Sequence, residues 1–232
     1  MISILIPVYN QADKIKACLE TIKNQTIQDF EIIIVNDGSK DNIEEVMEDC
    51  KGMFTQKFSF ISQVNQGAPA ARNRAWKEAT GEYLLFSDAD LKMEPTMFEE
   101  MLKALKENPE ASYAYCSHMF GEKLFRFWPF DADKLREIPY VHSTSLIRAK
   151  DFPEAGWDIT FKKFQDWDIF LTMLDNGKTG VWIDKVLFKI ETGGTMSGWL
   201  PAVAYRLFPF LPKVKKYQQW MAIIKKKHNI KF

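Results

Sequence analysis

The chain of 232 residues is 46% hydrophobic and 27% charged with a formal net charge of zero, a composition typical of a globular protein that buries a core. It contains no run of about 18 apolar residues, so we expect no ordinary transmembrane helix. Cys18, Cys50 and Cys116 form no C-x-x-C pair, which argues against a zinc site and favours reduced thiols in the cytoplasm. Because the first predicted strand begins at residue 2, we also expect no signal peptide.

Strand-like and helix-like segments alternate in the first 92 residues. The strands are predicted in the apolar runs "ISILIPVYN", "FEIIIVNDGS", "FSFISQVNQG" and "EYLLFSD". Helices are predicted between them, at residues 13–24, 41–50 and 68–79. The alternation predicts an α/β fold with a mostly parallel sheet and helices on both of its faces.

A polar cluster follows each of the four predicted strands. The clusters are Tyr9-Asn10, Asn36 to Ser39, Asn65 to Gly67 and Asp88 to Asp90. In open parallel sheets, ligands bind beyond the carboxyl ends of the strands. We therefore expect the four clusters to lie together and to form one ligand site.

The second half of the chain is predicted to add further strands and helices. A helix begins near Pro95, strands rich in aromatic residues occupy residues 111–130, and "VWIDKVLFKIE" is a late strand. In the helix "DWDIFLTML", we expect Ile169, Phe170 and Met173 to face inward. We expect one domain over residues 1–198, divided into a half at about 1–92 and a half at about 93–198.

The aspartates of "SDAD" are spaced so that both can act on one ligand. Residues i and i+2 of an extended chain point the same way, so Asp88 and Asp90 can present their carboxylates to one point. Oxygen ligands of this kind suit Mg²⁺ or Mn²⁺. The alternative is a turn in which both aspartates bind backbone N–H groups.

Two further polar residues are candidates for contacts with a ligand. In "NDGSKD", the flexible Gly38 is expected to leave Asp37 exposed and able to accept hydrogen bonds from a ring N–H, although an ordinary turn would also explain it. Arg72 lies in the first turns of a helix, where it would either bind an anion or form a surface ion pair. No G-x-G-x-x-G or G-x-x-x-x-G-K-[ST] motif is present, which argues against a dinucleotide-binding or P-loop enzyme.

Five segments together resemble the family 2 glycosyltransferases. "SILIPVYNQ", "FEIIIVNDGSKDN", "NQGAPAARNRA", "GEYLLFSDAD" and "AGWDITFKKFQDWDIFLTML" follow one another in the order and spacing of that family, over about residues 2–197. The resemblance implies the GT-A fold, which is Rossmann-like, and an inverting enzyme that uses a nucleotide-sugar donor. Loss of a nucleoside diphosphate is the kind of step that a divalent cation assists by stabilising negative charge.

The resemblance also implies roles for individual residues. It implies a nucleotide site made of Pro7, Tyr9, Asn10, Asp37, Arg72, Asp88 and Ala89. In this site Asp37 would bind the nucleobase, uracil or a related base. Asp88 and Asp90 would hold the ribose and a diphosphate bridged by Mn²⁺ or Mg²⁺, with Asp90 as the main metal ligand.

The general base implied by the resemblance is Asp166, since a carboxylate opposite the donor can take the proton of an acceptor hydroxyl. The position of Asp166 before an apolar helix would equally suit a helix cap, and Asp168 is expected to face elsewhere. Gln165 departs from the family, which usually has glutamate there, so acceptor binding or the acidity of the base is expected to differ. His142 and Ser143, together with Gln165, are candidates for the acceptor pocket, and His142 would equally suit a structural role.

The function implied is transfer of one sugar, with UDP as the commonest carrier, to a glycan or a lipid-linked acceptor. The absence of a Q-x-x-R-W motif argues against a processive synthase. One alternative is a relative that binds nucleotide sugar or glycan with little turnover. Another is a sugar nucleotidyltransferase, which would need a glycine-rich basic loop where this chain has "PVYNQADK".

Residues 199–232 form a basic, aromatic tail. The tail has eight basic residues and no acidic one, whereas the first 198 residues carry 23 basic and 31 acidic side chains. Its apolar side chains recur at helical spacing at Val214, Tyr217, Met221 and Ile224. A basic amphipathic helix suits an anionic membrane surface, so peripheral attachment on the cytoplasmic side is predicted, with packing on the acidic domain as the alternative. No nucleic-acid module accompanies these charges, so no nucleic-acid partner is expected.

Overall fold

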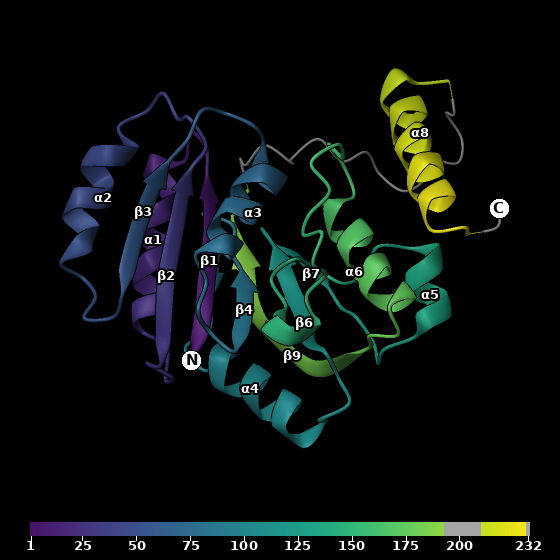
Figure 1. Cartoon of the computed structure of the whole chain (residues 1–232), viewed down its shortest axis with the longest axis horizontal. Helices are drawn as coiled ribbons and strands as arrows, with labels where there is room; N and C mark the ends of the chain where they lie inside the picture. Colours follow the sequence, from purple (N-terminus) through teal and green to yellow (C-terminus); the bar gives the residue numbers. More distant parts are fainter. Residues whose placement is uncertain (193–209, 231–232) are drawn as a thin grey trace.

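The four apolar runs form the parallel part of a mixed sheet in the computed structural model, which describes residues 1–192 and 210–230 (Figure 1). The strands β1 (Ile2–Val8), β2 (Phe30–Asn36), β3 (Phe58–Ser62) and β4 (Tyr83–Phe86) lie in the order β3-β2-β1-β4. All three pairings between them are parallel. The prediction of a parallel α/β sheet is therefore confirmed for this half.

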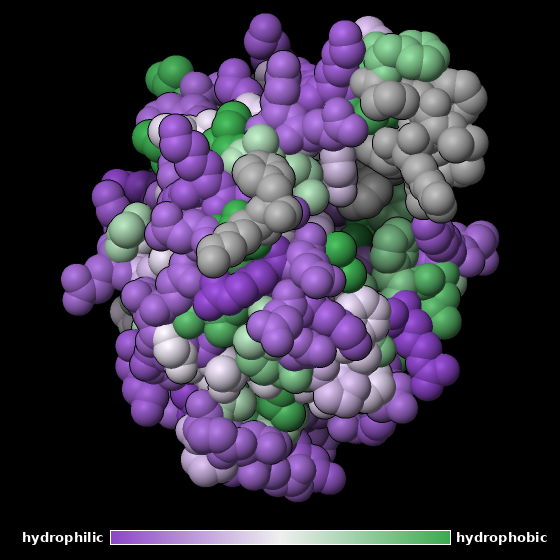
Figure 2. Space-filling view, turned by 90° about the vertical axis from the view of Figure 1, so that its right-hand side faces the viewer, coloured by the Kyte–Doolittle hydropathy of each residue, from purple (hydrophilic) through white to green (hydrophobic). Residues whose placement is uncertain are grey.

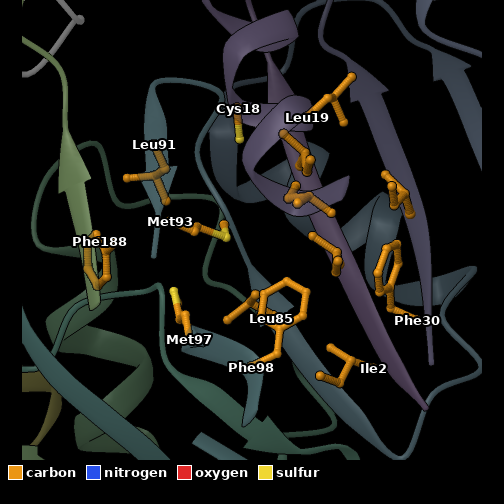
Figure 3. Packing of buried hydrophobic residues seen from close by; sticks show 14 of the residues in the cluster. Ile2, Cys18, Leu19, Phe30, Leu85, Leu91, Met93, Met97, Phe98 and Phe188 are labelled. Atoms are coloured by element: carbon orange, nitrogen blue, oxygen red, sulfur yellow. The ribbon is translucent and has the colours of Figure 1, made fainter. Parts of the chain in front are cut away.

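The central strands are apolar throughout because both of their faces are covered. Ile4 and Ile6 of β1 belong to one buried cluster, and Leu5 between them belongs to the other. The first cluster lies under α1 (Ala12–Lys23), α2 (Ile43–Lys51) and α4 (Met97–Glu107), and Figure 3 shows part of its packing. The second lies under α3 (Ala68–Lys77), α5 (Ala132–Glu137) and α6 (Gln165–Asp175).

The second half of the chain extends the sheet in a mixed direction. β8 (Leu146–Arg148) runs antiparallel to both β4 and β6 (Tyr113–Phe120), and β9 (Gly180–Ile190) runs parallel to β6. At the edges, β5 (Leu91–Met93) pairs antiparallel with β9, and β7 (Lys123–Phe125) forms a hairpin with β6. A short 3₁₀ helix, η1 (Ala149–Asp151), follows β8. These strands were predicted only in part, because β5 and β8 have three residues each.

The order of the strands reverses between β1 and β4. The chain runs outward from β1 to β3 and then returns to place β4 on the other side of β1. The pairing of β1 with β4 ends at Leu5 and Phe86, whereas the pairing with β2 continues to Val8. Pro7, which has no N–H to donate, is tolerated in this central strand because it lies beyond the pairing with β4. Ligands of open α/β sheets bind at such a reversal point.

The basic tail contributes a helix that packs on the domain. In α8 (Pro212–Lys227), Val214 and Ile224 are completely buried, and Tyr217 packs its ring against Phe164. Figure 2 shows this side of the molecule, where hydrophilic side chains predominate and hydrophobic ones gather in patches. In the described residues no helix has the length and apolar character needed to cross a membrane. The predicted domain boundary at residue 198 lies outside the described residues.

The apolar side chains of α8 therefore follow the alternative interpretation, packing on the domain. Met221 is partly buried against the second cluster. Lys227 is bonded to Asp158 and Asp168, and His228 lies between Asp168 and Asp175. These contacts join α8 to α6, the helix that carries Asp166.

Candidate active site

The loops that follow β1 and β2 are joined by the side chain of Asn10. Its carboxamide oxygen accepts a hydrogen bond from the backbone N–H of Lys40 at 2.8 Å, and the backbone N–H of Asn10 donates to the hydroxyl of Ser39 at 3.0 Å. Asn10 adopts a left-handed backbone with φ of 52°, which asparagine tolerates well. Beside it, Tyr9 is exposed, whereas Pro7 is buried in β1. Of the three residues expected at this strand end, only Tyr9 and Asn10 are accessible to a nucleoside.

Asp37 is buried, and the expectation that it is exposed was wrong. Its side chain accepts from the Gln63 amide at 2.8 Å and from the backbone N–H groups of Gln66 and Gly67 at 2.9 and 2.7 Å. The physical reason is that the loop before α3 turns its N–H groups toward this carboxylate. A carboxylate offers about four lone-pair sites, so Asp37 keeps roughly one for a base.

Arg72 connects the two halves of the domain. From α3 its guanidinium donates to the Asp88 carboxylate at 2.8 Å and to the Gln165 side-chain oxygen at 3.0 Å. It is 5% exposed and lies over the ring of Trp157, 4.8 Å from the ring centroid. The predicted alternative of a surface ion pair does not apply, since this arginine is buried.

Gln165 is therefore a link to Arg72. Besides accepting from Arg72, it donates its amide to the backbone oxygen of Phe161 at 2.9 Å. Because the amide at this position is neutral, Asp88 is the one carboxylate bonded to Arg72 in the described part of the chain. A glutamate would place a second carboxylate on the same guanidinium.

The two aspartates of the D-x-D sequence lie in different electrostatic surroundings. Burial alone would raise the pKa of Asp88, but the charge and the hydrogen bond of Arg72 hold it below its usual value. For Asp90, burial and the charge of Asp88 raise the pKa to about 6. Asp88 is thus neutralised within the chain, whereas Asp90 keeps a charge that is only partly compensated.

This donor set fits a divalent cation only with help from a ligand. Within residues 1–192 and 210–230, no three His, Cys, Asp or Glu side chains are grouped to hold a metal ion. One oxygen of Asp88 already binds Arg72, which makes Asp90, with no ion pair among the described residues, the better placed to coordinate a cation. Mg²⁺ is often held by one or two carboxylates together with substrate phosphates. The residues present fit that kind of site.

Asp166 lies near the start of α6 without capping it. The cap position is Phe164, which has a φ of 59° and makes no side-chain cap bond, and the helix begins at Gln165. The carboxylate of Asp166 instead accepts from the backbone N–H of Ser143 at 3.3 Å. The helix-cap alternative is therefore excluded. Asp168 faces the tail helix, as expected of a structural residue.

His142 and Ser143 lie in the loop before β8, beside the aspartates. The Ser143 hydroxyl is buried without a hydrogen-bond partner among the described residues. The His142 ring accepts from the backbone N–H of Thr144 at 3.1 Å and packs against His118 and Phe188. His142 therefore has structural contacts as well as a place near Asp88.

Ala89, expected to contact the nucleotide, has its side chain in the core. Its methyl group is completely buried in the cluster under α1. A contact with a nucleotide would have to come from its backbone. Sequence reasoning missed two residues of this region, Trp157 under Arg72 and Lys14 on α1. The sequence gave no signal for Lys14 beyond its place one turn before Cys18, a buried residue of α1.

Comparisons with known proteins identify the family. The sequence model described as "Glycosyl transferase family 2" matches residues 3–166. The uncharacterized glycosyltransferase YibD of Escherichia coli (strain K12) is 33% identical over 159 residues, which are 67% of this chain and 43% of that protein. The chain thus spans less than half the length of this relative.

Solved structures show the same fold at low sequence identity. TarS of S. aureus in complex with UDP superposes with a TM-score of 0.68 at 20% identity, over 83% of this chain and 60% of that one. A mannosyltransferase of Pyrobaculum calidifontis in complex with GDP-Man and Mn²⁺ gives a TM-score of 0.67 at 17% identity, over 85% and 58% of the two chains. The GT-A fold expected from the sequence is confirmed.

Proposed function

Because the chain belongs to glycosyl transferase family 2, we propose that it transfers one sugar from a nucleoside-diphosphate donor to a hydroxyl group and inverts the anomeric carbon. The observation that carries the proposal is the bridge made by Arg72 between Asp88 and Gln165. This bridge joins the strand end where the donor would bind to the helix start that carries Asp166. The buried Arg72 thus connects the part of the site where the donor would bind to the part that carries the proposed general base.

In the proposed reaction, Asp166 acts as the general base. It takes the proton of the acceptor hydroxyl while the oxygen attacks the anomeric carbon, and the bond from that carbon to the diphosphate oxygen breaks. The proton ends on Asp166 and the electron pair on the nucleoside diphosphate. Because attack and departure take place on opposite faces, the product has the inverted configuration.

The leaving group needs positive charge beside it. A divalent cation bound at Asp90 would stabilise the negative charge on the departing diphosphate. Arg72 keeps Asp88 ionised and fixed in position, so Asp88 is available for the ribose side of the donor. Exposed Tyr9 and the remaining acceptor site of Asp37 are proposed to contact the nucleoside.

UDP is the first candidate for the nucleotide and GDP the second. TarS was solved with UDP and with UDP-GlcNAc, and the mannosyltransferase with GDP-Man. At these levels of identity the likeness concerns the fold, so the identity of the nucleobase is a proposal. The acceptor is proposed to be a glycan or a lipid-linked saccharide.

A thermal-shift panel tests the donor directly. A ligand that binds only the folded chain raises its melting temperature by mass action. We expect UDP or GDP, and the matching nucleotide sugars, to raise it in Mn²⁺ and to do so less with a chelator. If no nucleoside diphosphate raises the melting temperature in either buffer, the proposal is wrong.

Gln165 favours one alternative, a relative that binds donor with little turnover. The neutral side chain removes a charge beside the proposed base. Hydrolysis or transfer measured with a panel of acceptors separates the two functions. A chain that binds nucleotide sugar but turns over none of the panel would favour the binding function.

Peripheral membrane attachment is proposed through the outer face of α8. The domain covers Val214 and Ile224 of this helix, although Ile223 is exposed, so the attraction would be mainly electrostatic, at roughly 1 kcal/mol for each lysine near an anionic surface. Of the exposed lysines of α8, three are chosen for the test: Lys215, Lys216 and Lys226.

A flotation assay with anionic vesicles tests this attachment. The triple lysine-to-glutamine variant of these residues is expected to bind roughly a hundredfold more weakly than the parent chain. A control variant changes three exposed lysines on other helices: Lys16, Lys23 and Lys51. Equal flotation of the two variants would contradict attachment through α8.

A further inference from the structure

We infer that Lys14 is a second donor-site cation, whose ammonium group binds the diphosphate of the donor beside Asp90. The inference rests on the proposed function and adds a residue to its donor site. It assigns to α1 a direct part in binding, whereas the motifs of the sequence pointed only to the strand ends and to α3.

Lys14 lies on the side of α1 that faces the D-x-D aspartates. It precedes Cys18 by four residues, so the two side chains share one face of the helix. The thiol of Cys18 lies 3.7 Å from the backbone oxygen of Asp88 and 3.8 Å from the hydroxyl of Ser87. Figure 3 shows Cys18 close to Leu91, the residue that follows Asp90. Lys14 is one turn nearer the carboxyl ends of the strands, where the ligand would lie.

The ammonium group of Lys14 is buried and has no partner in the part of the chain that the structure describes. Its Nζ atom exposes less than 1 Å² and makes no hydrogen bond. Burying a charged group without a partner is strongly unfavourable, and nearly all buried polar groups in folded proteins are paired. An unpaired buried cation beside a ligand site is therefore a group that a bound anion would satisfy.

Lys14 differs in this respect from the other cation of the site. Arg72 reaches Asp88 from α3, on the opposite face of the sheet, and is already bonded to Asp88 and to Gln165. Lys14 makes no hydrogen bond to Asp90, although its charge partly opposes the rise in the pKa of Asp90 that burial and Asp88 cause. Two nitrogens of Arg72 are thus bonded to the protein and only its Nε lacks a partner among the described residues, whereas the ammonium group of Lys14 is wholly available to a ligand.

A bound diphosphate would interact with both Lys14 and Asp90. Its oxygens would accept hydrogen bonds from Lys14, and Asp90 would keep its carboxylate for a divalent cation bound to the same diphosphate. A nucleoside monophosphate lacks the second phosphate group and would gain less. Lys14 is therefore expected to favour diphosphates over monophosphates.

Calorimetric titrations of the full chain with UDP and UMP, in buffer with Mn²⁺, test the inference. GDP and GMP serve as a second pair of ligands. We expect Lys14→Met to weaken binding of the diphosphate about tenfold or more, as for the loss of a charge-assisted hydrogen bond, and binding of the monophosphate less than about threefold. Lys16→Met, at an exposed position of the same helix, is the matched control and is expected to bind like the parent. Lys14→Arg, which keeps the charge, should recover part of the diphosphate affinity.

Two results would overturn the inference while leaving the proposed function intact. One is diphosphate affinity in Lys14→Met equal to or higher than in the parent. The other is the same loss for monophosphate and diphosphate, which would indicate a general disturbance of the site. If the parent chain binds none of the four nucleotides, the proposed function fails with the inference.

Discussion

Charged residues lie at both ends of the central strands. The two groups differ in how completely other residues of the protein pair with them through hydrogen bonds and ion pairs. At the amino end, Glu31 is 1% exposed and accepts hydrogen bonds from Ser3, Lys57 and Thr80 at 2.6 to 2.8 Å. Burial alone would raise the pKa of Glu31, but these bonds lower it to about 2. The carboxylate of Glu31 is thus paired by other residues of the protein.

At the carboxyl end, the charged groups are only partly satisfied. Asp88 has Arg72 as its partner, but the pKa of Asp90 is raised to about 6 by burial and by the charge of Asp88. Among the described residues, the Nζ atom of Lys14 and the hydroxyl of Ser143 are buried without partners. The two ends therefore differ in how completely their charged groups are paired.

The difference separates stability from function. A buried carboxylate with all its partners in the chain contributes to folding, as Glu31 does. Buried charges that lack partners lower stability, and they are expected where a ligand supplies what is missing. The comparison therefore predicts that substitutions at the amino end change stability and that those at the carboxyl end change ligand binding and turnover.

The largest expected effect is that of Asp166→Asn on turnover. Loss of a general base typically lowers the rate about 10²- to 10⁴-fold. The melting temperature should change little, since among the described residues Asp166 makes one hydrogen bond, of 3.3 Å, with the N–H of Ser143. Initial rates with a nucleotide sugar measure the effect, and Asp184→Asn, at an exposed carboxylate, is the control. Normal turnover in Asp166→Asn would remove the base from the mechanism.

The next effect is that of Glu31→Gln on stability. Since the pKa of Glu31 is about 2 in the folded chain against 4.5 ordinarily, its ionised form stabilises the fold above about pH 4.5, and that stability is lost as the pH falls toward 2. We expect the substitution to lower the free energy of unfolding by about 2–3 kcal/mol at pH 7, measured by urea denaturation.

The same variant should lose part of the acid dependence of stability and keep its affinity for nucleotide. Glu78→Gln, which removes an exposed partner of Arg74, is the control and should change stability by less than about 0.5 kcal/mol. A Glu31→Gln chain as stable as the parent, or one that is stable but binds nucleotide poorly, would break the proposed division between the two ends.

The smallest effect is expected for Gln165→Glu. A second carboxylate on Arg72 would strengthen its hold on α6, and its charge beside Asp166 should move the acidic limb of the pH–rate profile to higher pH by less than about one pH unit. We expect turnover to change less than about tenfold. Gln28→Glu, at an exposed position near the amino end, is the control. An unchanged pH–rate profile and acceptor preference would show that residue 165 does not influence the base.

The parallel half of the fold could be predicted because burial on both faces leaves an unbroken apolar run, as in β1. The three-residue strands β5 and β8 could not, since so short a segment has no period to detect. The apolar stripe of α8 predicted a helix correctly. It did not reveal that the domain itself covers that stripe.

The candidate site residues were predicted by motif, but their contacts could not be. Asp37 was expected to be exposed because a glycine follows it, whereas backbone N–H groups about thirty positions later bury it. The bond between Arg72 and Gln165 joins residues 93 positions apart, which no local pattern reports. Lys14 is an ordinary helical lysine by sequence, and its lack of a partner is visible only in the folded chain.

The most direct test of the central claim is the affinity for UDP, or for GDP if that is the nucleotide bound, measured by calorimetry with Mn²⁺ and with a chelator. We predict that Asp90→Asn weakens binding in Mn²⁺ about tenfold or more, to near the value that the parent shows with the chelator. Glu31→Gln should bind like the parent under conditions in which both are folded. Equal affinity in Asp90→Asn and the parent, with no effect of the chelator, would contradict the account.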